Sequence, residues 1–117
     1  EIGNYTVMTH SNKTGTAPAV WSEAVKAYRS VKPVTLADEI KRDPNWGGRD
    51  VDLIICYSGA WAQNVADYLG VYVRAPRGTV GVWYDDAGVF GYRPKDGLGW
   101  LTFVPQKDRK GWQVPTK

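Results

Sequence analysis

A nearly continuous apolar run in the middle of the chain, residues 51–57, constrains its fold more than any other feature. Such a run is typical of a strand that is buried on both faces, and strands of this kind belong to parallel sheets. After it, residues 60–69 carry apolar side chains at helical spacing, Gly70 can cap that helix, and residues 71–74 indicate a further strand. Strand, helix and strand with short joints form a βαβ unit. We therefore expect an α/β fold in which residues 51–57 form the central strand.

The N-terminal half adds three more expected elements. Residues 4–9 indicate a strand, and a polar loop follows at residues 11–16. Apolar side chains recur at helical spacing over residues 18–29, behind a proline that suits a first helical turn, and they predict a helix there. A second helix is expected to run from an N-cap at Thr35 to Pro44, which ends it.

The C-terminal half changes character. Short β segments alternate there with turn-rich stretches, which is the layout of an antiparallel meander, and the segments are residues 79–84, 89–92 and 100–104. Asp85 and Asp86 resemble a pair of catalytic carboxylates, but their place between two β segments favours a hairpin turn. The chain, residues 1–117, is thus predicted to be a single α/β domain. Its small, mostly parallel sheet is flanked by helices and has an antiparallel C-terminal β extension.

The chain has a mild excess of basic residues, with 15 Lys and Arg against 12 Asp and Glu and a net charge of +3. This balance fits a polyanionic substrate or an acidic partner. Several cations fall in a basic C-terminal tail, residues 105–117, with Trp112 among them. Basic side chains with an interleaved aromatic suit nucleic acid, and they equally suit a plain solvated terminus.

The sequence also excludes some classes of site. With one cysteine the chain forms no internal disulfide, and no His or Cys spacing suggests a metal site, so we expect neither metal nor cofactor. The apolar stretches are too short to span a membrane, and the N-terminus lacks the basic-then-apolar pattern of a signal peptide. Because the chain begins with Glu1 instead of Met, we expect a domain cut from a longer polypeptide.

The only histidine and the only cysteine stand in matching places. His10 follows the first expected strand, and Cys56 lies at the C-terminal end of the central one. Because the carboxyl ends of neighbouring parallel strands face one crevice, the two side chains could meet there, together with the hydroxyls of Tyr57 and Ser58. The alternatives are packing roles: a buried cysteine, a hydrogen-bonded histidine, a packed tyrosine and a turn serine.

Four motifs follow one another along the chain. They are a helix, a strand ending in Cys-x-Ser-Gly, a helix that leads into Gly-Val-x-Val-x-Ala-Pro, and a closing strand with aromatic-x-x-Phe-x-Pro. They occupy residues 34–45, 51–59, 62–76 and 99–105. In this order they resemble the C-terminal toxin domains of bacterial polymorphic toxins, including the tips of contact-dependent growth inhibition proteins and of Rhs-repeat proteins. In the second helix Val65 stands where an Ala-x-x-Leu pattern would have leucine.

The resemblance implies a role in competition between bacteria. It implies delivery by a larger secreted or cell-surface carrier, action in the cytoplasm of a neighbouring bacterium, and a cognate immunity protein that protects the producer. Given the basic charge, we expect that immunity protein to be acidic. The resemblance leaves the reaction open, because such toxin tips include RNases, DNases, deaminases and peptidases.

The main expectation for the reaction is a metal-independent ribonuclease, for which tRNA is one candidate substrate. An imidazole can exchange a proton near neutral pH, so His10 would serve as general acid or base. Lys13, Arg74 or Arg77 would stabilise the charge that develops on the phosphate. Basic charge and six tryptophans favour this reaction.

The alternative is a thiol peptidase in which His10 and Cys56 form a dyad. Such a dyad resembles that of caspase-type peptidases, in which both residues follow adjacent parallel strands. Those enzymes typically carry His-Gly, whereas this chain has His10-Ser11. A third class is a non-catalytic toxin that acts by sequestering a host protein.

Overall fold

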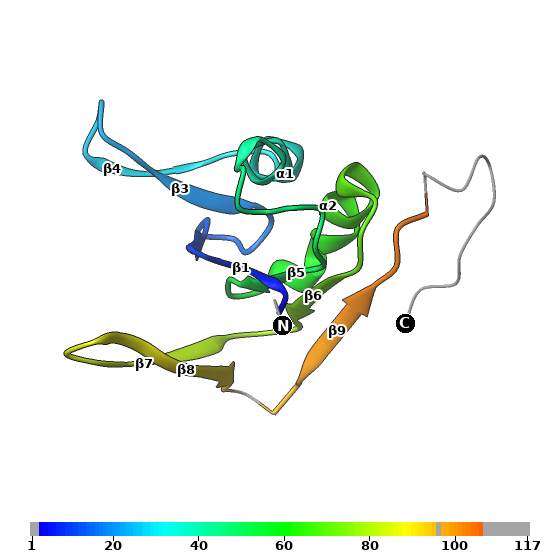
Figure 1. Cartoon of the computed structure of the whole chain (residues 1–117). Coiled ribbons are helices and arrows are strands. Elements are labelled where there is room, and N and C mark those ends of the chain that lie inside the picture. Colours follow the sequence, from blue (N-terminus) through cyan, green and yellow to red (C-terminus); the bar gives the residue numbers. More distant parts are fainter. Residues whose placement is uncertain (1–2, 96, 107–117) are drawn as a thin grey trace.

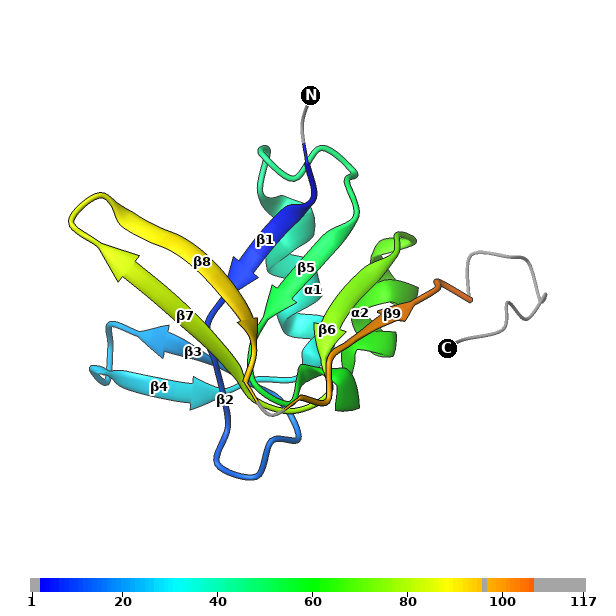
Figure 2. The ribbon, with the colours of Figure 1, turned by 90° about the horizontal axis from the view of Figure 1, so that it is seen from below.

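The computed structural model describes residues 3–95 and 97–106, and its centre is a four-stranded sheet with strand order β1-β5-β6-β9 (Figures 1 and 2). The strands are β1 (Tyr5–Met8), β5 (Val51–Ile54), β6 (Val73–Pro76) and β9 (Trp100–Phe103). β1, β5 and β6 run parallel to one another, and β9 runs antiparallel to β6. The predicted α/β class, with a mostly parallel sheet and antiparallel C-terminal strands, is confirmed.

Helices α1 (Pro33–Arg42) and α2 (Ala62–Leu69) cover one face of the sheet, and the core lies between them and the strands (Figure 1). The parallel strands β1, β5 and β6 follow chain order across the sheet, which keeps both helical connections on the same side. All four residues of β5 are buried, as the apolar run predicted. The core side chains include Leu36, Ile40, Val51, Leu53, Val65 and Val73.

The helix ends follow local chemistry. Gly70 adopts the left-handed conformation (φ 71°) and caps α2, as predicted. A short 3-10 turn, η1 (Ser58–Ala60), precedes that helix. α1 begins with Pro33 in its first turn, and its N-cap is Lys32 instead of the predicted Thr35. Proline lacks an N–H and has a φ that suits the first turn, so it sets the start of the helix.

The predicted helix over residues 18–29 is wrong. This segment is a β-hairpin whose first strand also pairs with a short strand after β1; the three strands are β2 (His10–Ser11), β3 (Pro18–Ser22) and β4 (Ala27–Ser30). Val20 packs against the core, while Trp21 and Tyr28 face each other across the hairpin. Aromatic and β-branched side chains favour strands over helices, and here that preference prevailed.

The C-terminal β segments are only partly as predicted. β7 (Val80–Asp85) and β8 (Gly88–Pro94) form the expected hairpin, with Asp85 and Asp86 at its turn. The expected three-stranded meander is wrong, because β9 returns to pair with β6, where Leu101 and Phe103 join the main core. The β7–β8 hairpin projects from the body of the domain (Figures 1 and 2). Of the predicted basic tail, residues 105–117, the part that follows Gln106 lies outside the described residues.

Candidate active site

The carboxyl edge of the parallel sheet gathers most of the predicted site residues. Met8 of β1 is paired with Ile54 of β5. His10 and Cys56 each lie two residues beyond this last pair, past the ends of β1 and β5. The only histidine and the only cysteine of the chain thus follow the carboxyl ends of two neighbouring parallel strands, although His10 itself belongs to β2 of the smaller sheet.

The backbone at His10 is fixed by the β2–β3 pairing. His10 is paired with Ala19, and the hydroxyl of Thr9 donates a 2.7 Å hydrogen bond to the Ala19 carbonyl oxygen. The His10 side chain is exposed, and its imidazole contacts the ring of Tyr28 edge to face, with the ring centroids 4.6 Å apart. Among the hydrogen bonds of the described residues, 3–95 and 97–106, none joins His10 to Cys56.

Cys56 lies against the start of β7. Its side chain is half-buried, and Sγ accepts a hydrogen bond from the backbone N–H of Val80 at 3.4 Å. As a thiol, it can also donate to the Val80 carbonyl oxygen at 3.8 Å. The two contacts hold the sulfur against the backbone at the start of β7.

Tyr57 and Ser58 make the sharp turn from β5 into η1. Tyr57 has φ 62°, which is uncommon for a residue other than glycine, and its backbone N–H donates to the Gly78 carbonyl at 2.7 Å. The Tyr57 side chain is exposed. The Ser58 side chain is fully buried, and its Oγ has no hydrogen-bond partner among the described residues. Of these two predicted hydroxyls, only that of Tyr57 therefore faces solvent.

The polar loop after β2 packs onto this turn. A Cβ built on Gly15 would lie 3.2 Å from the Cβ of Tyr57, so the loop that carries Lys13 touches the β5–α2 connection. Arg77 lies beside the same connection, since its Cα is 3.5 Å from the position that a Cβ on Gly59 would take. Both cations are exposed, and neither forms an ion pair with any described residue.

Arg74 lies away from this edge, on the sheet face opposite the helices. Its guanidinium donates two hydrogen bonds to Asp52 of β5, at 3.2 and 3.0 Å, and lies 4.4 Å from the ring of Trp100. Asp52 is only 5% exposed and also accepts a hydrogen bond from Asn4 at 3.1 Å. Since its charge is compensated, Arg74 has a structural partner that the sequence analysis missed. The sequence held a signal for this ion pair, because Asp52 is the single acid inside the apolar run at residues 51–57.

The matching family model is a domain of unknown function (DUF8616), which covers residues 1–91. The chain belongs to this family. The match includes β1, β5 and the whole carboxyl edge, and it ends within β8. Comparison with curated proteins and comparison with solved structures give no match.

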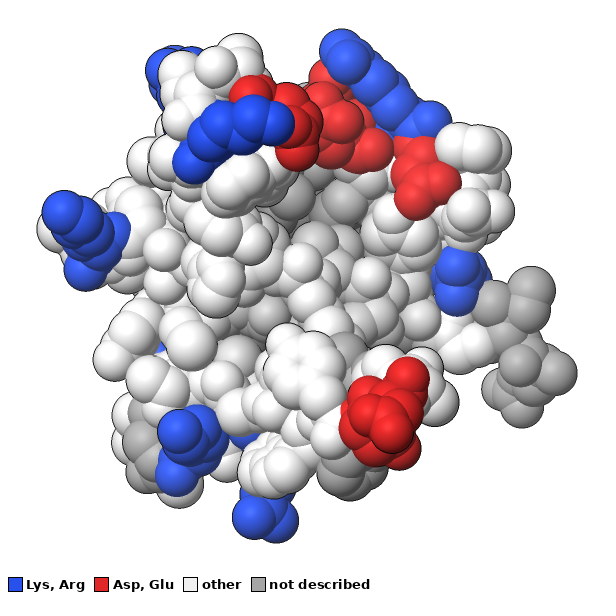
Figure 3. Space-filling view, turned by 90° about the vertical axis from the view of Figure 1, so that its left-hand side faces the viewer, with Lys and Arg blue, Asp and Glu red and all other residues white. Residues whose placement is uncertain are grey.

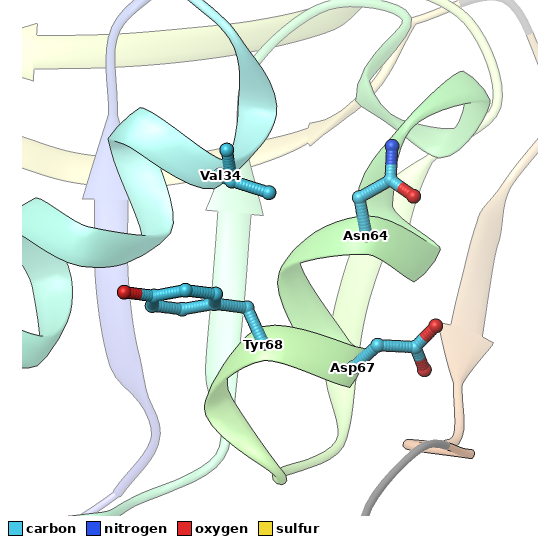
Figure 4. Close-up of a pocket in the computed structure, with 4 residues that line it drawn as sticks. All are labelled: Val34, Asn64, Asp67 and Tyr68. Carbon is cyan, nitrogen blue, oxygen red and sulfur yellow. The ribbon is translucent and has the colours of Figure 1, made fainter.

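The surface of this DUF8616 domain is hollowed on two sides. On the side from which the hairpins project, a largely uncharged hollow is surrounded by charged side chains (Figure 3). On the helical side, a pocket of about 330 Å³ lies between α1 and α2 and contains none of the predicted site residues (Figure 4). The hydroxyl of Tyr68 in that pocket donates to Asp38 at 2.9 Å, and this hydrogen bond raises the pKa of Tyr68.

Among the described residues, no group of three or more His, Cys, Asp or Glu side chains is placed to hold a metal ion. The helices within the same residues are too short and too polar to cross a membrane.

Proposed function

We propose that this domain is an interbacterial toxin that acts as a thiol peptidase, with Cys56 as nucleophile and His10 as its base. The observation that supports the proposal is the parallel β1–β5 pairing, since His10 and Cys56 each follow by two residues the last pair, Met8 and Ile54. The toxin role is supported by the motif order of residues 34–105, which resembles bacterial polymorphic toxins. In that role the domain would act in the cytoplasm of a neighbouring bacterium.

The proposed reaction has two balanced steps. His10 takes the proton of the Cys56 thiol, the thiolate attacks the carbonyl carbon of a peptide bond, and the amine leaves with the proton from the imidazolium. Water then hydrolyses the thioester and restores the thiol. Proton transfer requires the imidazole and Sγ to lie within hydrogen-bond reach directly or through one water, and such contacts commonly shorten only with substrate bound.

Alkylation tests the dyad without any knowledge of the substrate. Because Cys56 is the only cysteine, the uptake of iodoacetamide measured by intact mass reports on that residue alone. We expect His10→Ala to slow alkylation at neutral pH by about tenfold or more, since it removes the base that generates the thiolate. Thr6→Ala, an exposed change on β1, is the matched control and should alkylate at the parental rate. Equal rates for parent and His10→Ala would exclude the dyad.

A ribonuclease is the second candidate, and the exposed cations at the carboxyl edge favour it. Lys13 and Arg77 flank the turn at Tyr57 and have no acidic partner among the described residues. With His10 as acid or base, they could stabilise a phosphate during attack by the 2′-hydroxyl. RNA, with tRNA as one candidate, would then be the substrate.

Expression of the domain in bacterial cytosol separates the candidates. Growth arrest with new protein fragments and intact RNA, lost in Cys56→Ser, supports the peptidase. Discrete RNA fragments that persist in Cys56→Ser and disappear in His10→Ala support the ribonuclease. Growth arrest that survives both substitutions in folded protein would leave only the non-catalytic toxin.

A further inference from the structure

We infer that Tyr28 is a positioning residue that holds the His10 imidazole in place for proton exchange with Cys56. The inference rests on the proposed dyad. It gives a function to the β3–β4 hairpin, which follows His10 in the sequence and whose first strand pairs with β2.

The contact between His10 and Tyr28 is a defined ring contact. The ring centroids are 4.6 Å apart and the ring planes are inclined at 89°. The hairpin register explains it: His10 pairs with Ala19, and Trp21, two residues further along β3, pairs with Tyr28. Since alternate residues of a strand share a face, all three rings lie on the same side of this small sheet.

The Tyr28 ring is itself held in place. Trp21 contacts it edge to face with centroids 5.4 Å apart, and the Trp21 indole N–H donates to Glu23 at 2.8 Å. Glu23 in turn forms a 2.6 Å ion pair with Lys26 across the hairpin turn. The exposed hairpin therefore carries an ordered row of side chains that ends at the imidazole.

Packing in the core does not account for these two aromatic side chains. Trp21 and Tyr28 are each 49% exposed, whereas the core-facing residue of the same hairpin is Val20. The Tyr28 hydroxyl has no hydrogen-bond partner in the part of the chain that the structure describes. The ring is therefore the part of Tyr28 that acts on His10.

The effect on reactivity follows from the freedom of an exposed side chain. Without a neighbour, the imidazole samples several rotamers, and only some direct it toward Cys56. An edge-to-face ring pair changes such a population by roughly two- to tenfold. Loss of the Tyr28 ring is expected to slow proton exchange with the thiol by that factor.

The alkylation rate of Cys56 tests this role. We expect Tyr28→Leu to lower the rate two- to tenfold and Tyr28→Phe, which keeps the ring, to retain it. Tyr72→Leu is the control, because Tyr72 has a similar exposure of 46% and lies on the α2–β6 connection. In a His10→Ala background, Tyr28→Leu should have no further effect. An unchanged or faster rate in Tyr28→Leu, or an effect that persists without His10, would overturn the inference.

A second measurement separates this inference from the dyad. Since the chain has one histidine, its imidazole C–H signals in the proton NMR spectrum are unambiguous. Ring currents should displace them in the parent and in Tyr28→Phe but not in folded Tyr28→Leu. Imidazole signals at the same position in the parent and in Tyr28→Leu would overturn the positioning role of Tyr28 but not the dyad. Moved signals together with a His10→Ala alkylation rate equal to the parent's overturn the dyad and, with it, the role of Tyr28 toward Cys56.

Discussion

At Gly15 the polar loop after β2 touches the turn that follows β5. Its φ of 72° lies in the left-handed region, and an added Cβ would lie 3.2 Å from the Cβ of Tyr57. The position thus needs glycine for two independent reasons, the conformation of the backbone and the space beside it. Any larger residue would push the Lys13 loop away from the candidate site.

We predict that Gly15→Ala destabilises the domain by about 1 kcal/mol more than Gly47→Ala does. Gly47 is the matched control, because its φ of 62° imposes the same backbone strain while nothing lies within 4 Å of the added methyl group. Urea unfolding measures both free energies of unfolding. Equal losses of unfolding free energy in the two variants would show that the contact with Tyr57 adds nothing to the cost of Gly15→Ala.

The Asp52–Arg74 ion pair gives an asymmetric prediction. Arg74→Met leaves a nearly buried carboxylate without its guanidinium and should cost about 3 kcal/mol. Asp52→Asn should cost less, about 1 to 2 kcal/mol, because the Arg74 side chain is 38% exposed and water can solvate it. The double variant Asp52→Leu with Arg74→Met should be more stable than Arg74→Met alone. A double variant no more stable than Arg74→Met alone in urea unfolding would contradict this coupling.

The sequence predicted where the reactive residues stand but not what surrounds them. That His10 and Cys56 follow the ends of two parallel strands was predictable, because strand ends can be recognised from apolar runs. Their contacts, Tyr28 for the imidazole and the Val80 backbone for the sulfur, come from hairpins whose position depends on tertiary pairing. The burial of Ser58 was likewise invisible, since a serine in a turn is ordinarily exposed.

Among the elements, those with strong local signals were predicted and those set by long-range pairing were not. The helix at residues 60–69 had both apolar spacing and a glycine cap, and α2 is there. Residues 18–29 had the spacing without a cap, and pairing of β2 with β3 selected a hairpin. β9 was recognised as a strand, but its partner β6 lies far back in the chain, beyond the reach of a local pattern.

The hydrogen bond that Tyr5 donates to Asp43 ties β1 to the end of α1 and predicts an alkaline loss of stability. Burial, and then this hydrogen bond, raise the pKa of Tyr5 from 10.0 to about 12. The resulting stabilisation is complete below pH 10 and is lost as the pH rises from there through about 12, because the unfolded chain gives up the proton first.

Unfolding free energies measured across this alkaline range test the prediction. The stability advantage of the parent over Tyr5→Phe should shrink with rising pH. Tyr84→Phe, which changes a tyrosine that is 70% exposed, is the control and should follow the parent. A constant difference between parent and Tyr5→Phe would show that the Tyr5 hydroxyl titrates alike in folded and unfolded chains.

For the whole molecule, the distribution of unpaired cations predicts how an acidic immunity protein would associate, if the proposed toxin role includes one. Complementary charge speeds encounter, so we expect Lys13→Glu with Arg77→Glu to slow association by about tenfold at low salt and to weaken its salt dependence. Arg42→Glu with Lys41→Glu makes the same charge change on α1 and should have a smaller effect. Equal effects, measured by stopped-flow mixing, would mean that net charge alone steers the partner.

The pairing of β1 with β5 would also determine when the proposed dyad can form. Tyr5 is paired with Val51, so a long stretch of chain must be ordered before these strands meet, whereas β5, α2 and β6 are close in sequence. Local units form faster than such distant pairings. A chain threaded through a membrane in an unfolded state therefore carries both His10 and Cys56 but no dyad. For the proposed toxin, refolding in the recipient would itself be the activation step, and the producing cell would be exposed to a competent site only after folding is complete.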